Sequence, residues 1–130
     1  MGMQMQALLI VATVLCLTSI IHATPGIAVF YEPPYTPSKC YGNQDKGPWV
    51  AGVNDALWNN GAACGRRYRV RCTGGANLAP HPCKPGTSVV VTVVDYCKRP
   101  CNGIINLSKQ AFSQIADTDA GKVKVEYVNA

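Results

Sequence analysis

Histidine, acidic residues and closely spaced cysteine pairs are scarce in this sequence. The 130 residues include two histidines and seven acidic side chains, against twelve lysines and arginines. No Cys-x-x-Cys pair occurs, and His81 is the one histidine beyond the apolar amino-terminal segment. The usual ligand spacing of a zinc site is therefore missing. We expect neither a metal nor a cofactor.

Charged residues are also missing from the first part of the chain. Residues 7–17 are almost continuously apolar, and Ala23 offers a small residue for cleavage, which is typical of a secretory signal peptide. A retained membrane anchor is the alternative, but polar residues interrupt the apolar segment and no basic residue directly follows it. We predict a signal peptide over residues 1–23, a single secreted domain over residues 24–130, and no membrane-spanning segment after cleavage.

Cysteine usage fits that secreted location. Seven cysteines, less Cys16 in the leader, leave six in the predicted domain. An even number in a small secreted chain indicates three disulfides, each of which adds roughly 2–4 kcal/mol where the hydrophobic core is small. The count alone leaves the pairing open. The six are Cys40, Cys64, Cys72, Cys83, Cys97 and Cys101.

The net charge of +5 falls entirely within the predicted domain, because the leader carries no charged side chain. A basic secreted protein is suited to acidic polysaccharides or to anionic cell surfaces. Nucleic acid is not an expected partner, because no nucleic-acid-binding module is recognisable. We expect a monomer that meets its partner outside the cell.

The pattern of apolar and turn residues predicts a mainly β chain. The Val-rich segment 88–97 is expected to be a central strand buried on both faces. Apolar residues within 108–116 share one helical face, with Ser108 as the N-cap. Further strands are predicted at residues 26–31, 66–72 and 122–128, a helical turn at 53–58, and irregular loops at 35–52 and 74–86. Together these elements indicate a small β-barrel.

Three aromatic residues, Tyr35, Tyr41 and Trp49, lie in the first predicted loop. They can stack on sugar rings or on a partner protein, or they can fill and cover a small core. We treat them as candidate binding residues.

Arginines cluster at the following predicted strand. If residues 66–72 form a strand, alternation places Arg67, Arg69 and Arg71 on one face and apolar side chains on the other. Guanidinium groups match the geometry of carboxylates, so these three and the preceding Arg66 form a candidate anion-binding stripe. The ordinary solvated face of a half-buried strand explains the same pattern.

Asp95 is the candidate catalytic residue, because it lies where the central strand meets a loop. Hydrolysis of a glycosidic bond needs two carboxylates, one on each side of the bond. A structural role, in which Asp95 accepts backbone N–H bonds at a corner of the barrel, is the interpretation we favour.

Several motifs occur in the order seen in expansin and barwin-like proteins. They are Gly26-x-Ala28-x-Phe30-Tyr31, Asn59-Asn60-Gly61-x-x-Cys64-Gly65, the Val-rich strand to Asp95, and Asn106-Leu107-Ser108-x-x-Ala111-Phe112. Within that group, the run from Ala63 to Cys72 resembles plant natriuretic peptides and EG45-like, blight-associated p12-type proteins. The resemblance covers residues 25–130 and implies a six-stranded double-psi β-barrel. It also implies the disulfides Cys40–Cys64, Cys72–Cys83 and Cys97–Cys101.

The same resemblance implies that catalysis has been lost. Expansins keep one acidic residue at the position of Asp95 and a second in a His-Phe-Asp-Leu-Ser motif. Here that motif is matched by residues 104–108, and Asn106 replaces the aspartate. An amide does not transfer a proton at accessible pH, so we predict that the protein is not an enzyme. Residues 106–108 also form an N-glycosylation sequon, whose occupancy the sequence leaves open.

The resemblance further implies a hormone-like protein of the apoplast or cell wall that alters water and ion homeostasis through a plasma-membrane receptor. It places the activity in the stretch from Tyr35 to Arg67. The alternatives are non-hydrolytic binding or loosening of wall polysaccharide, or a defence-associated role. Expansins also carry a second, carbohydrate-binding domain, for which we expect no room in this chain.

Overall fold

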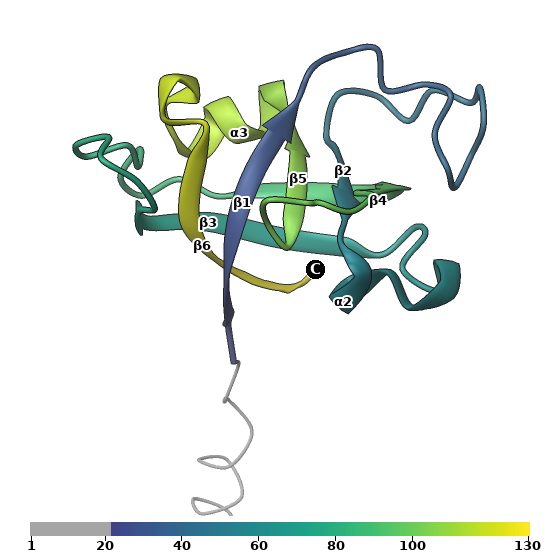
Figure 1. Ribbon diagram of the computed structural model, residues 1–130, viewed down its shortest axis with the longest axis horizontal. Helices are drawn as coiled ribbons and strands as arrows, with labels where there is room; N and C mark the ends of the chain where they lie inside the picture. The colour runs from purple at the N-terminus through teal and green to yellow at the C-terminus, as the bar shows by residue number, and fades with distance from the viewer. Residues whose placement is uncertain (1–21) are drawn as a thin grey trace, which may run out of the picture.

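Six strands close into a barrel in the computed structural model, which describes residues 22–130 (Figure 1). Hydrogen-bonded neighbours follow the order β1-β5-β2-β4-β3-β6 around the ring. The pairs β1–β5 and β2–β4 are parallel, and the other four pairs are antiparallel. The strands are β1 (Thr24–Tyr31), β2 (Val50–Val53), β3 (Arg67–Gly75), β4 (Val89–Tyr96), β5 (Ile105–Ser108) and β6 (Lys122–Asn129). The predicted mainly β, six-stranded barrel is confirmed.

Two of the six strands were not predicted from the sequence pattern. The expectation of a loop over residues 35–52 and a helical turn over 53–58 is wrong where the two meet, because β2 lies there. The helix α2 (Asp55–Trp58) begins only two residues after β2 ends. β5 likewise precedes the predicted helix. Each missed strand has four residues, which is too short for an alternating pattern to be recognised.

The core lies inside the barrel and follows the alternation of the strands. In β3 the side chains of Tyr68 and Val70 are buried between exposed arginines, as predicted. The expectation that the central strand is buried on both faces is wrong for β4. Val91 is fully buried, whereas Val90 and Thr92 are only half-buried. The outer face of a closed barrel reaches solvent wherever no helix or loop covers it, and this produces the difference.

The helix α3 (Lys109–Ile115) directly follows β5. Ser108 caps it, because its hydroxyl accepts a hydrogen bond from the backbone N–H of Ala111 at 3.1 Å, as predicted. Phe112 is fully buried and packs on Phe30 of β1, with ring centroids 4.9 Å apart. The helix therefore anchors the end of β5 to the core of the barrel.

Three disulfides join Cys40 to Cys64, Cys72 to Cys83, and Cys97 to Cys101. These are the pairs implied by the family resemblance. The first fixes the long loop between β1 and β2 to the turn after α2. The second closes the irregular segment after β3, and the third closes a short loop between β4 and β5.

Nearly all of the predicted signal peptide, residues 1–23, falls outside the described residues. Within residues 22–130, no helix has the length and apolar character needed to cross a membrane.

Candidate functional site

Three neighbouring strands place Asn106, Gly52 and Asp95 side by side. Gly52 of β2 pairs with Asn106 of β5 on one side and with Asp95 of β4 on the other. The neighbours of Asn106, Ile105 and Leu107, are fully buried, so the Asn106 side chain points away from the core. A Cβ atom on Gly52 would lie 3.4 Å from the backbone oxygen of Asp95. As a glycine, residue 52 leaves the space between the two polar residues free of a side chain.

Tyr31, the last residue of β1, completes this group. Val29 pairs with Asn106, and Tyr31 lies two residues further along β1, so the Tyr31 and Asn106 side chains leave the sheet on the same face. Burial raises the pKa of the Tyr31 hydroxyl far above its ordinary value, and the charge of Asp95 raises it further. Tyr31, Gly52, Asp95 and Asn106 are called the polar row below.

Two atoms of the polar row have no protein partner. Tyr31 Oη and Asn106 Oδ1 are buried and form no hydrogen bond with any residue from 22 to 130. A buried polar atom without a partner costs about 1–3 kcal/mol, and such atoms are uncommon in native proteins. The phenol is a donor and the amide oxygen an acceptor. A ligand hydroxyl, which donates and accepts, is complementary to both.

Asp95 is engaged by the backbone. Its Oδ1 accepts hydrogen bonds from the backbone N–H groups of Lys39 and Tyr96, each at 3.0 Å. The next residue of the first loop is held in the same way, because the Cys40 N–H donates to the Val94 carbonyl at 2.9 Å. The carboxylate therefore fastens the long loop across the end of β4, which is the structural role favoured from the sequence.

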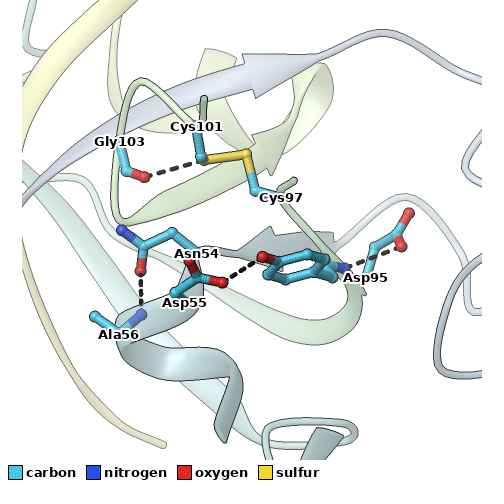
Figure 2. Close-up of a disulfide and its surroundings, with 8 residues drawn as sticks. Asn54, Asp55, Ala56, Asp95, Cys97, Cys101 and Gly103 are labelled. Carbon is cyan, nitrogen blue, oxygen red and sulfur yellow. Dashed lines mark hydrogen bonds between the residues drawn. A yellow bond between two sulfur atoms is a disulfide. The ribbon is translucent and has the colours of Figure 1, made fainter. Parts of the chain in front are cut away.

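The polar row contains one carboxylate. Asp95 and Asn106 lie two strand spacings apart, about 10 Å between their backbones. A two-acid mechanism would need a second carboxylic acid where Asn106 carries an amide. The carboxylate of Asp55 does not supply it, because Asp95 points away from Asp55 (Figure 2).

Asp55 belongs to a separate cluster that the sequence analysis missed. It accepts hydrogen bonds from the Tyr96 hydroxyl and from Arg99, and these lower the pKa of its carboxyl group. The cluster lies beside the Cys97–Cys101 disulfide, at an open cavity of about 540 Å³ (Figure 2). No pattern in the sequence links Asp55 to residues some forty positions later, so only the fold reveals the cluster.

The predicted aromatic residues do not form one exposed surface. The Tyr35 hydroxyl donates to the Tyr31 carbonyl at 3.1 Å and accepts from the Lys109 N–H at 3.0 Å, so Tyr35 joins β1 to α3. Tyr41 is half-buried beneath the ammonium group of Lys46. Trp49 is the one aromatic residue of the three that is exposed, at 39%. Their role in binding stays a prediction.

The predicted arginine stripe lies on the outer face of the barrel. Arg66, Arg67, Arg69 and Arg71 are all exposed. Arg71 donates to Glu126 of the neighbouring strand β6, with 2.6 Å between nitrogen and oxygen. Within residues 22–130, Arg71 is thus the member of the stripe that forms an ion pair, and Arg66, Arg67 and Arg69 form none. The stripe lies on β3 and, for Arg66, directly before it, whereas the polar row lies on β1, β5, β2 and β4.

Comparison with known proteins begins with the barrel. A family model described as lytic transglycolase, a double-psi β-barrel domain, matches residues 50–127. An expansin from Clavibacter michiganensis, solved in mutant form in complex with cellohexaose, superposes with a TM-score of 0.66 and 25% identity. The match covers 84% of this chain and 50% of that expansin. These matches define the class as a double-psi β-barrel related to expansins.

Two curated relatives are similar over nearly their whole length. An EG45-like domain containing protein from Citrus jambhiri is 47% identical over 132 residues and covers all of both chains. EG45-like domain containing protein 2 from Arabidopsis thaliana is 53% identical over 111 residues, covering 85% of this chain and 84% of the relative. The chain belongs to the family of EG45-like domain containing proteins.

The structural role of Asp95 predicts a loss of stability when its carboxylate is removed. Asp95→Ala should lower the free energy of unfolding by about 1–3 kcal/mol, because two backbone N–H groups lose their acceptor. Asp95→Asn should cost less, because the amide oxygen still accepts. Urea denaturation measures both, with Asp119→Ala, a change at an exposed acid, as the control. Equal stability of Asp95→Ala and wild type would contradict the assignment.

Tyr31 should make the protein sensitive to alkali. The folded state holds the phenolic proton at pH values where the unfolded chain loses it. The contribution of Tyr31 to the free energy of unfolding is therefore complete below about pH 10 and is lost as the pH rises further. Melting temperatures followed by circular dichroism between about pH 8 and 11.5 should fall less steeply for Tyr31→Phe than for wild type. Parallel curves would show that Tyr31 does not hold its proton more tightly when folded.

Proposed function

We propose that this chain is a non-catalytic protein of the plant cell wall that binds a neutral, hydroxyl-rich glycan at the polar row and leaves it uncut. The observation that carries the proposal is a pair of buried atoms, Tyr31 Oη and Asn106 Oδ1, that have no hydrogen-bond partner among residues 22–130. Sugar hydroxyls both donate and accept, so they have the hydrogen-bonding chemistry that these two atoms lack in a protein partner. The glycine at position 52 leaves the strand between Asn106 and Asp95 without a side chain.

The related proteins support this reading. The expansin that shares the barrel was solved with cellohexaose, a neutral glucan. Asn106 provides the reason for binding without cleavage, because its amide cannot protonate a leaving oxygen. A secreted location, expected from the amino-terminal segment, would bring the protein to such glycans.

Calorimetric titration with cellohexaose tests the proposal. Tyr31→Phe and Asn106→Leu should each weaken binding by roughly 2- to 10-fold, the value of one hydrogen bond. Tyr127→Phe is the matched control, because this phenol belongs to β6, outside the polar row. No release of reducing sugar is expected.

Two results would contradict the proposal. Cellohexaose binding that is absent, or unchanged in both variants, would remove the polar row as the binding site. Reducing sugar released by wild type and abolished in Asp95→Ala would show that the protein is an enzyme.

A second candidate function is hormone-like signalling at a plasma-membrane receptor, with an effect on water and ion homeostasis. The surface that favours it lies between residues 35 and 67. The Cys40–Cys64 disulfide holds this stretch rigid, and Trp49, Arg66 and Arg67 are exposed on it. Rigid loops with exposed aromatic and arginine side chains are typical protein-binding surfaces.

Labelled protein applied to plant protoplasts tests this second function. We expect saturable binding and a change in protoplast volume, both reduced at least about tenfold by Trp49→Ala combined with Arg66→Ala, because such residues commonly dominate an interface. Leu78→Ala, at an exposed residue outside the stretch, is the control. Binding that does not saturate would exclude a receptor for this surface. Binding that the Trp49→Ala, Arg66→Ala double variant retains as fully as the Leu78→Ala control would exclude it too.

A further inference from the structure

The outer face of β3 and β6 carries an excess of positive charge. Alternation brings Arg67, Arg69 and Arg71 to this face from β3, and Lys122 and Lys124 from β6. Five cations less the carboxylate of Glu126 leave a net charge of +4 on this face. We call these five cations the cationic strip.

Strand register arranges the cationic strip as a line. Arg71 pairs with Glu126, and Lys124 pairs with Gly74 further along β3. Val123 pairs with Gly75, so Lys122 extends the line just past the end of β3. The strip therefore follows the nine residues of β3 over about 25 Å. A Cβ atom on Gly74 would have no neighbour within 4 Å, so the line is open beside Lys124.

Most of the strip lacks an acidic partner. Among residues 22–130, Arg71 is the one member that forms an ion pair, with Glu126 at 2.6 Å. Like charges on one face of neighbouring strands repel one another. A small cavity of about 80 Å³ opens beside Arg69 and Arg71, and Glu126 also lines it. Arg71 already holds the Glu126 carboxylate there, so Arg69 is the guanidinium of this cavity that a ligand carboxylate would meet.

The central strands of the cationic strip and of the polar row lie across the barrel from one another, and the two surfaces adjoin at Lys122, which pairs with Val29 beside Asn106. The ring order is β1-β5-β2-β4-β3-β6, so β3 is three strands from β5 and β6 is three strands from β2. Arg69 of β3 is therefore three strands from Asn106 of β5, which is half of the ring.

We propose that the cationic strip is a second ligand surface, which binds an extended acidic polysaccharide of the polyuronate class. A linear polymer with repeated carboxylates matches a line of guanidinium and ammonium groups better than a flat anionic membrane does. The face is convex and one strand pair wide, so a flat membrane would contact little of it. It also lacks apolar residues that could enter a membrane, because the large exposed apolar residues of the described chain are only Trp49 and Leu78. This inference rests on the proposed cell-wall function, because the wall is where the protein would meet such a polymer.

Titration with polygalacturonate at low ionic strength tests the strip. Arg67→Gln combined with Arg69→Gln should weaken binding about 5- to 10-fold, because two exposed charge pairs are lost. Affinity for the wild type should fall as sodium chloride is added, because the Debye length shrinks to about 10 Å at 0.1 M. Lys39→Gln combined with Lys98→Gln removes the same charge from exposed loop residues and is the matched control.

The outcomes separate the two sites. Loss in the strip variant alone, with cellohexaose binding unchanged by saturating polygalacturonate, supports the strip. Polygalacturonate binding through the strip without any cellohexaose binding would support the strip and remove the polar row. An equal loss of polygalacturonate affinity in the control variant would show that the effect comes from net charge alone, and it would overturn the assignment of the strip as the binding surface. No binding of polygalacturonate, or binding only to phosphatidylserine vesicles, would also overturn it.

Discussion

Closure of the barrel through the four residues of β5 is the constraint on which the rest of the structure depends. β5 pairs with β1 on one side and β2 on the other, so this short strand joins the two ends of an otherwise open sheet. Closure leaves the ring without free edges, which removes the template for pairing with other chains. Ser108 holds β5 in place through its cap of α3, and Phe112 then anchors that helix in the core.

The polar row is a product of that closure. Asn106 and Asp95 are eleven positions apart in the chain, and they face the same side chain-free space only because β2 enters between β4 and β5. The loop that crosses the end of β4 is tied there by the Asp95 carboxylate and by the Cys40–Cys64 disulfide. The Asp95 carboxylate thus holds the scaffold together, while the Asn106 amide places a buried acceptor two strands away.

Much of the barrel is predictable from the sequence because its longer strands carry a strong local pattern. The alternation in β3 and β6, the Val-rich β4 and the cap at Ser108 are local signals. β2 and β5 lack such a signal, since each has only four residues: Gly52 interrupts β2, and β5 carries two polar residues that resemble a loop. The site was only partly predictable. Asp95 and Asn106 could be found through a family resemblance, whereas the buried hydroxyl of Tyr31 depends on packing between strands that are distant in sequence.

The ring order of the strands has a mechanical consequence. If both proposed surfaces bind, one on β5 and β2 and the other on β3 and β6, a single molecule would crosslink two polymers. Such crosslinks would form only while free polymer sites outnumber protein molecules. At higher protein levels each polymer would be coated separately and the crosslinks would be lost, so the stiffness of a mixed network would rise and then fall with dose.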